Sequence, residues 1–376
     1  MRFSASIFVA LVAIGAQSNC AANSVRYNIV ELDVLPGGLD SLAFGLNDVG
    51  QVVGTSRRDR STHIGQSRPV VWDYTGQPTE LWSDQNVGGT LNDINNRGEI
   101  VGRYGSGSGI PLPTAGVPFG RAFYWSEATG RIDIGFEPVG NSQAVAINEL
   151  GQVVGTSERL EYVEIEPGNF QYQYIPHPFI WDKENGIRDL GTLGGYGGFA
   201  TAINNLEQVV GYADLASGYN RAFVWDDMNG IRELETPPGA DSRAAAINDL
   251  GHVVGGGPGT GSVMWKLIEG TVMPFPGGRA INNLGQTVGG AFIVDGSNGV
   301  LPLSDLVQSG VGWTIENSFA INDRSEIVGY GLRDGKVLGV LMTPVPEPRF
   351  FQFALVAIAL ILVQFRILSN CCFGNR

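Results

Sequence analysis

Cysteine is nearly absent from the 376-residue chain, and its three copies, Cys20, Cys371 and Cys372, lie near the two ends. The stretch between Ala21 and Asn370 therefore has no disulfide, no thiolate nucleophile and no cysteine-based metal site. Without covalent cross-links, the folded chain must be stabilised by a large apolar core.

Basic residues are also few, with 24 Lys and Arg against 37 Asp and Glu, for a formal net charge of −13. Binding to a nucleic-acid backbone needs clustered Lys and Arg side chains that neutralise phosphates. We therefore expect no nucleic-acid partner.

The motifs of common catalytic sites are missing as well. The chain has no Gly-x-Ser-x-Gly, no His-Glu-x-x-His, no Walker loop and no Gly-x-Gly-x-x-Gly that opens a helix. Its three histidines, His63, His177 and His252, fall at different places in their repeats, and His177 takes the position held elsewhere by Arg121 and Arg221. We predict no catalytic residue, no metal and no cofactor. One alternative stays open, in which carboxylates converge at the mouth of the fold.

What the chain does have is a nonapeptide, Leu-Asn-Asp-Val-Gly-Gln-Val-Val-Gly at Leu46–Gly54, which returns six times. In every copy a Gly follows the Asn by seven positions. The later copies are Ile94–Gly102, Ile147–Gly155, Ile203–Gly211, Ile247–Gly255, Ile281–Gly289 and Ile321–Gly329. A spacing of roughly 34 to 56 residues in a strand-rich chain is typical of propellers and solenoids.

The nonapeptide has the pattern of a β-hairpin. Its Asn can hydrogen-bond its own backbone two residues on, and the Gly three residues later supplies the positive φ of a turn with a G1 bulge. Glu207 and Ser325 replace that Gly in two copies, so we expect a local strain of roughly 1–2 kcal/mol there. The alternative is a calcium half-site, but each copy offers one or two oxygen side chains where calcium takes 6–8 ligands.

Four strands per repeat follow from the pattern: strand a before the Asn, strand b after it, an aromatic strand c and a final strand d. Phe179 and Trp181 illustrate strand c, because residues two apart share a face, which we interpret as inter-blade core rather than a ligand platform. The last repeat, Phe319–Met342, lacks strand d, whereas Tyr27–Leu35 is a lone strand d. Joining them near Lys336–Leu341 predicts an all-β, seven-bladed β-propeller over residues 23–343, closed by an N-terminal strand.

The repeats resemble a known family in detail. Arg-Ala-Phe-Val-Trp-Asp at Arg221–Asp226, His-Pro-Phe-Ile-Trp at His177–Trp181 and Asp-Leu-Gly-Thr-Leu-Gly-Gly at Asp189–Gly195 look like HAF repeats, a family of extracellular repeats. The resemblance covers nearly all of Tyr27–Thr343 and weakens in the last three copies. It implies an exported propeller-like protein and no particular activity.

Residues 1–22 have the pattern of a signal peptide, with Arg2 before the apolar run Ile7–Ala16. Cleavage after Ala22 is favoured over cleavage after Ser18, because small residues precede it. The alternative is an uncleaved anchor, although the apolar run is short for a membrane span.

The C-terminal end resembles a PEP-CTERM sorting signal of bacterial envelope proteins. Pro346, Glu347 and Pro348 lie in a linker at 344–349, followed by an apolar segment at 350–368 and a short tail at 369–376. The resemblance implies one transmembrane helix, and envelope sorting and processing machinery as partners. The alternative is a buried C-terminal helix.

Insertions between strands b and c are the best pointer to function. Three neighbouring repeats carry long ones, at Ser56–Arg68, Arg103–Arg121 and Ser157–His177, which we interpret as loops on one face. The third is rich in aromatic and acidic residues, and its predicted binding residues are Tyr162, Tyr172, Tyr174 and Glu164. The alternative is a variable surface loop that has no role in binding.

These features predict a non-enzymatic binding or matrix module of the bacterial envelope or exopolysaccharide layer. Its partner would be a polysaccharide or another surface protein. The alternative function is an extracellular glycan hydrolase or lyase with carboxylates at the propeller mouth.

Overall fold

The computed structural model describes residues 25–58, 67–82, 87–106, 120–136, 140–236, 240–258, 261–296, 298–308 and 312–345. The predicted signal peptide, the Pro346-Glu347-Pro348 motif, the predicted transmembrane segment at 350–368 and the tail lie outside these residues. Within them, no helix is both long and apolar enough to cross a membrane.

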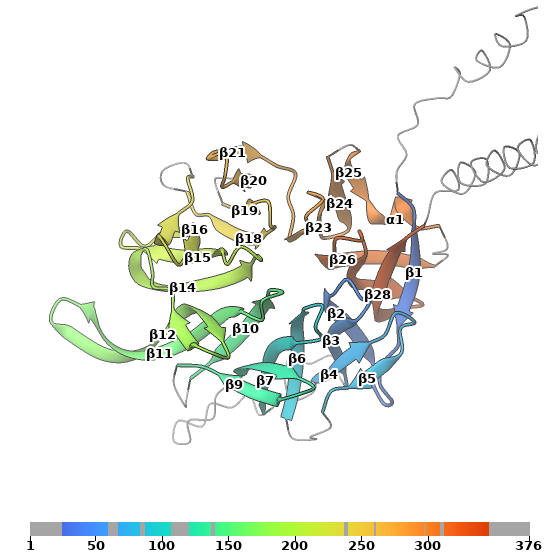
Figure 1. Cartoon of the computed structure of the whole chain (residues 1–376), viewed down its shortest axis with the longest axis horizontal. Helices are drawn as coiled ribbons and strands as arrows, with labels where there is room; N and C mark the ends of the chain where they lie inside the picture. The colour runs from blue at the N-terminus through green and yellow to red at the C-terminus, as the bar shows by residue number, and fades with distance from the viewer. Residues whose placement is uncertain are drawn as a thin grey trace, which may run out of the picture.

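The described strands form seven four-stranded antiparallel sheets arranged in a ring, which confirms the seven-bladed β-propeller (Figure 1). In blades one to six the spatial order of the strands is their order in the sequence. Blades one to three contain β2 (Asp40–Leu46), β3 (Val52–Arg57), β4 (Ser67–Trp72) and β5 (Pro78–Glu80); β6 (Val87–Ile94), β7 (Ile100–Ser106), β8 (Arg121–Ser126) and β9 (Gly130–Ile134); β10 (Ser142–Ile147), β11 (Val153–Glu166), β12 (Asn169–Asp182) and β13 (Gly186–Asp189).

The later blades repeat the same order, and the first three strands of blade six are the shortest of their kind. Blades four to six contain β14 (Gly194–Ile203), β15 (Val209–Leu215), β16 (Asn220–Asp226) and β17 (Gly230–Glu233); β18 (Arg243–Ile247), β19 (His252–Gly257), β20 (Gly261–Lys266) and β21 (Thr271–Pro274); β22 (Ala280–Ile281), β23 (Thr287–Gly289), β24 (Phe292–Asp295) and β25 (Gly299–Pro302). A four-residue helix, α1 (Leu303–Leu306), follows β25, and its two leucines are buried.

Blade seven closes the ring with the two ends of the chain. Its sheet order is β1 (Tyr27–Leu32), β28 (Lys336–Pro344), β27 (Ile327–Arg333) and β26 (Trp313–Ile321). Tyr27 lies opposite Pro344 and Leu32 opposite Gly339, so the predicted pairing is confirmed with a register shifted toward the end of β28. Figure 1 shows the N-terminal strand beside the last blade. The pairing removes two exposed sheet edges.

The repeated Asn opens the a–b turn as predicted. Asn47 accepts a hydrogen bond through Oδ1 from the amide of Val49 (3.2 Å), and Gly50 adopts a φ of 88°. Glu207 and Ser325, which replace the turn glycine, adopt φ values of 61° and 60°. Both non-glycine residues are therefore held in the left-handed region, as predicted.

The first strand of six blades contains a β-bulge three residues before the Asn, and the blade-six equivalent directly precedes β22. A bulge leaves one residue out of the ladder and re-aims its side chain. We call these seven residues the axial positions; they are Phe44, Asn92, Val145, Thr201, Ala245, Arg279 and Phe319.

The bulge also explains the second constant residue of the nonapeptide. A Cβ on Gly155 would lie 1.9 Å from the carbonyl oxygen of Gln143, and one on Gly54 would lie 2.0 Å from that of Leu42. Strand b therefore has no room for a side chain where it passes the bulged strand a.

The core lies between neighbouring blades, as predicted for strand c. Trp181 and Phe179 pack with Val101 and Tyr124 of the preceding blade, and Trp225 packs with Ile180 in the next interface. These side chains are buried, so the strand c aromatics are core residues.

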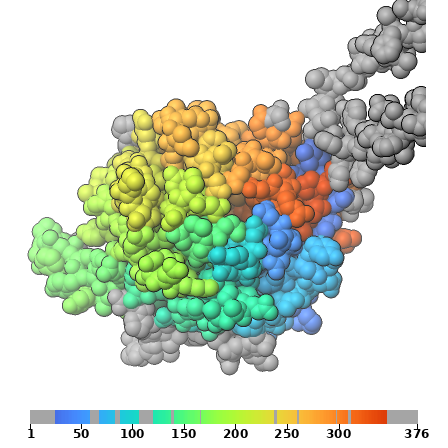
Figure 2. All heavy atoms as spheres, in the orientation of Figure 1, coloured from blue at the N-terminus to red at the C-terminus, as the bar shows by residue number. Residues whose placement is uncertain are grey.

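One prediction about an element was wrong. The Ser157–His177 insertion is no loop, because β11 and β12 are each 14 residues long and pair from Val153/Trp181 to Glu166/Asn169. The resulting hairpin, which we call the arm (residues 158–176), extends beyond the other blades in Figure 1 and as a green lobe in Figure 2. The other two insertions fall mostly outside the described residues.

Candidate functional site

Seven asparagines form a closed ring of hydrogen bonds at the a–b turns, which we call the asparagine ring. Each Nδ2 donates to the backbone carbonyl of the equivalent Asn in the next blade, over 2.9–3.1 Å. The last bond runs from Asn322 to Asn47 and completes the circle. The members, all buried, are Asn47, Asn95, Asn148, Asn204, Asn248, Asn282 and Asn322.

In six of the seven blades the amide of this Asn uses both donors and both acceptor positions, and in all seven its oxygen accepts two N–H groups. Asn148, for example, also donates from Nδ2 to Gln152 Oε1 (2.8 Å), and its Oδ1 accepts from the amides of Leu150 and Gln152. Because the amide oxygen already accepts two N–H groups, it is not directed toward a cation. The asparagines therefore hold neighbouring blades together.

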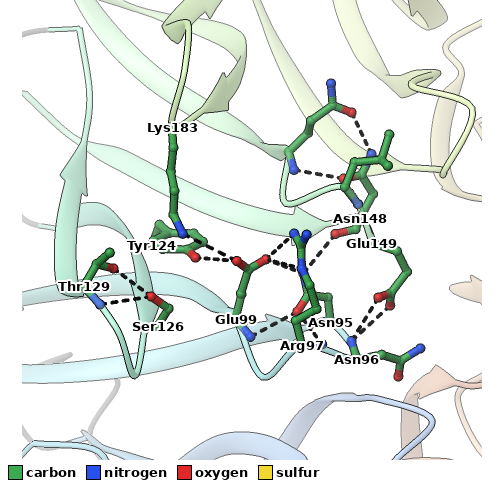
Figure 3. Close-up of polar contacts among 12 residues, drawn as sticks. Asn95, Asn96, Arg97, Glu99, Tyr124, Ser126, Thr129, Asn148, Glu149 and Lys183 are labelled. Carbon is green, nitrogen blue, oxygen red and sulfur yellow. Dashed lines mark hydrogen bonds and ion pairs between the residues drawn. The ribbon is translucent and has the colours of Figure 1, made fainter.

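Around Asn95 the same network reaches the outer strands, as Figure 3 shows. Glu99 accepts from Asn95 Nδ2 (2.7 Å) and from the hydroxyl of Tyr124 (2.7 Å), and it forms ion pairs with Arg97 and with Lys183 of the next blade. This carboxylate links blade two to blade three and is shared among several partners, so we interpret it as structural.

A second ring surrounds the turn-side mouth, built from the residue after each Asn; we call it the mouth ring. Its carboxylates belong to Asp48, Glu149, Asp249 and Asp323. Each of the four accepts a hydrogen bond from a backbone amide of a neighbouring blade, at 2.8–3.3 Å. These carboxylates are thus part of the connection between blades. They are also the groups that a glycan hydrolase or lyase would use at the propeller mouth.

Asp93 also faces this mouth, at a position where the other six blades have Ala or Gly. Burial raises the pKa of Asp93 to about 7, against the opposing effect of hydrogen bonds from the amides of Ile147 and Ile94. It is a carboxyl group that changes its charge near neutral pH.

The arm brings the three predicted tyrosines together. Tyr162 lies directly opposite Tyr172, and Leu160 lies opposite Tyr174, so these four side chains share one face of the hairpin. Phe170 extends the same face, and its ring stacks on Tyr162 with centroids 5.5 Å apart. All five are exposed, with relative exposures of 46% for Leu160, 61% for Tyr162, 45% for Phe170, 70% for Tyr172 and 44% for Tyr174. We call this stripe the aromatic face.

Glu164, the fourth predicted binding residue, lies on the same face opposite Phe170. Its Oε1 accepts a hydrogen bond from the amide of Gly168 (2.7 Å), so it helps to close the hairpin turn. Tyr196 of blade four donates its hydroxyl to the carbonyl of Glu164 (3.1 Å). The arm is therefore contacted by the neighbouring blade near its turn.

The base of the arm contains the buried His177. Its Nδ1 lies 2.9 Å from Asp189 and its Nε2 lies 3.0 Å from Glu161. The contact with Asp189 raises the pKa of His177, which burial opposes. Although burial of Asp189 acts the other way, contacts from His177, the Gly191 amide and Arg159 lower the pKa of Asp189 to about 2.

Equivalent pairs occur in blades one, two and four, each between strand c and strand d. They are Arg68–Glu80, Arg121–Asp133 and Arg221–Glu233, with N···O distances of 3.9, 3.7 and 2.8 Å. His177 is thus the titratable version of a repeated structural ion pair, which agrees with the position that it shares with Arg121 and Arg221.

Two features were missed by reasoning from the sequence. The first is the inclusion of Leu160 in the aromatic face, which follows from its pairing with Tyr174. The alternation Phe170-Gln171-Tyr172-Gln173-Tyr174 after Gly168 is the strand signal that could have indicated a hairpin. The axial positions form the second feature, because the repeat pattern does not single out the residue three before each Asn, which is Phe44, Arg279 or Phe319 in three of the blades. Aligning the repeats on the Asn shows all three of these large side chains at one position.

Comparison with known proteins assigns no activity to this chain. A family model described as a protein of unknown function (DUF3466) matches residues 135–262, which is less than half of the chain. No curated protein sequence matches the chain.

Solved structures with similar folds include TolB from Acinetobacter baumannii (13% identity, 79% of this chain, 64% of that chain, TM-score 0.40). This chain thus spans less than two thirds of that TolB. A gluconolactonase from Xanthomonas campestris is similar at 10% identity, over 87% of this chain and 94% of that chain, with a TM-score of 0.41. YCF48 bound to a D1 peptide is similar at 11% identity, over 88% of this chain and all of that chain (100%), with a TM-score of 0.46. One of these is an enzyme and another binds a peptide, and at these values none of them assigns a function to this chain.

Proposed function

We propose that this protein is an exported, membrane-tethered binding module of the bacterial envelope, and that the aromatic face of the arm binds polysaccharide. The observation that carries the proposal is five apolar side chains exposed together on an arm that extends beyond the propeller. Contiguous exposed apolar surface marks interaction sites.

Sugar chemistry suits this face. Tyrosine offers a flat apolar ring, on which the C–H side of a sugar can stack, and a hydroxyl that can hydrogen-bond its hydroxyls. Glu164 adds a carboxylate beside the rings. An anionic polymer is disfavoured here, because Glu161, Glu164 and Glu166 lie in the same arm.

The enzymatic alternative is a glycan hydrolase or lyase. It would use the carboxylates of the mouth ring, but these accept backbone amides of neighbouring blades. Incubating the full-length chain with a panel of envelope polysaccharides distinguishes the two functions. Retention on a polysaccharide without release of product supports the binding module, whereas turnover would establish the enzyme.

Export and anchoring rest on the sequence, namely the signal-like residues 1–22 and the Pro346-Glu347-Pro348 motif before the apolar segment. We propose processing at this motif during envelope sorting. Mass spectrometry of the protein from its native envelope tests this proposal, since abundant peptides that run from Val345 into Phe365 would contradict it.

A further inference from the structure

A cavity of about 620 Å³ lies on the propeller axis, lined by all seven axial positions together with parts of the first strands and Tyr212. Its volume is within the range of small-molecule sites, about 300–1,000 Å³. Since each blade contributes its axial position, six of them through a bulge, the cavity is a product of the repeat and not of one loop.

The charge of this cavity differs from that of the whole chain. Arg243 and Arg279 line it, and no Asp or Glu does, although acidic residues outnumber basic ones 37 to 24 overall. A second cavity, of about 370 Å³, shares Tyr212 and adds Arg103. The acidic residue there, Glu158, is held by the amide of Asn141 (2.9 Å).

The guanidinium groups in these cavities lack the partners that other arginines have. Within the described part of the chain, the side chains of Arg103 and Arg279 make no hydrogen bond or ion pair, and burial lowers the pKa of both. Arg243 has one hydrogen bond, to the neutral Asn220 Oδ1 (3.1 Å). A guanidinium presents a planar fork of N–H donors that matches a carboxylate, so these groups are open to an anion.

Aromatic rings position the guanidinium groups of Arg243 and Arg279. Arg279 lies over Phe319, with its Cζ 4.7 Å from the ring centroid, and Arg243 lies over Tyr212 at 4.6 Å. Phe319 also packs against Phe44, with centroids 5.2 Å apart. The cavity thus combines positive charge with apolar ring surface.

Neutral hydrogen-bonding groups complete the lining. The side chains of Asn92, Gln143 and Thr201 come from three successive blades. Apolar faces, neutral amides and a hydroxyl are the groups that bind the C–H faces and hydroxyls of a sugar ring.

We propose that the axial cavity binds a carboxylate-bearing sugar, a uronic acid either free or at the end of a chain. Arg279 and Arg243 receive the carboxylate, and Phe44 and Phe319 contact the ring. This site uses other residues than the aromatic face of the arm, so the two proposals can fail separately.

Isothermal titration calorimetry on the full-length chain in detergent micelles tests the proposal, with glucuronate as the probe and glucose as its neutral match. We expect glucuronate to bind and glucose to bind at least about tenfold more weakly. Arg279→Gln and Arg243→Gln should each weaken glucuronate binding about tenfold or more, and Arg279→Lys should weaken it less. A uronic acid tetramer that binds more tightly than glucuronate would indicate a chain end as the natural source, and equal affinity would indicate the free acid.

Arg188→Gln is the matched control, because Arg188 also lies over an aromatic ring, Trp225 (4.8 Å), but pairs with Asp227 in the turn between β16 and β17. It should leave glucuronate binding unchanged, as should replacement of the three arm tyrosines. The proposal would be overturned if glucose or inorganic phosphate bound as tightly as glucuronate. Undiminished glucuronate binding in both folded Gln variants would overturn it as well.

Discussion

At the scale of single residues, the two constant positions of the nonapeptide have separate physical causes. The Asn has two donors and an oxygen that accepts two bonds, and the fold uses both donors and both acceptor positions in six of the blades. In blade five, His252 stands where the other blades have the Gln or Glu partner. In the six blades with a bulge, the Gly seven positions later is required by a carbonyl of the bulged strand, which a Cβ would approach to 1.9–2.1 Å.

Substitution of that glycine should be severe. Gly155→Ala would place a Cβ 1.9 Å from the Gln143 carbonyl, so the bulge or strand β11 must shift, at a cost of about 3 kcal/mol in the free energy of unfolding. Gly296→Ala is the control, because its Cβ would meet no atom within 4 Å and the cost should be under about 0.5 kcal/mol. Chemical denaturation measures both, and equal effects of the two substitutions would refute the steric account.

Asp93 makes stability depend on pH at the residue scale. Its pKa is about 7 in the folded protein and about 4 in the unfolded chain. The folded state therefore holds the extra proton between those values, and stability falls as the pH rises from about 4 to 7.

Asp93→Asn removes this titration. Relative to the wild type, the variant should gain on the order of 1–3 kcal/mol between pH 4 and pH 8, since the wild-type carboxyl is charged only at the higher pH. Denaturant unfolding at the two pH values measures this gain. A difference between variant and wild type that stays constant with pH would show that Asp93 does not titrate in this range.

At the scale of elements, the arm is where prediction from the sequence and the structure diverge most. The turns and the strand c aromatics could be predicted because they recur in the repeats. The closing strand could be predicted because the last repeat lacks strand d and the N-terminus has a lone one. The arm occurs in blade three alone among the described b–c connections, so it was interpreted as an insertion loop. In the structure the insertion forms a hairpin instead, with Tyr162 and Tyr172 paired on one face. The alternating side chains of this segment are typical of a strand.

The anchoring of the arm should respond to pH through His177. Because the pKa of His177 is raised in the folded state, its contribution is complete below about pH 6.5 and is lost as the pH rises through the folded value. His177→Arg, which copies Arg121 and Arg221, keeps the positive charge across this range. Melting temperatures at pH 6 and pH 9 should therefore differ less in the variant than in the wild type. An unchanged difference would assign the pH dependence to other groups.

At the scale of the whole molecule, the ring is closed three times over. Strand β1 completes blade seven, the asparagine ring returns from Asn322 to Asn47, and the mouth ring returns from Asp323 to Asp48. The first closure could be predicted from a missing strand. The two side-chain rings could not, because they depend on how neighbouring turns are oriented, which a linear repeat does not show.

The same limit applies to the candidate sites. The tyrosines of the arm were identified from composition, and their common face followed only from the pairing register. Arg243 and Arg279 are far from Phe44 and Asn92 in the sequence. Only the closed ring of blades places these four residues in one cavity.

The central functional proposal is that the aromatic face binds polysaccharide. Its most direct test is the affinity of the full-length chain for the retained polysaccharide, measured for the wild type and for a Tyr162→Ala, Tyr172→Ala, Tyr174→Ala variant. Tyr74→Ala, which removes another exposed tyrosine, is the control. We expect the triple variant to lose at least about 2 kcal/mol of binding free energy. Its melting temperature should stay close to that of the wild type. Unaltered affinity in a folded triple variant would contradict the proposal and direct attention to the axial cavity.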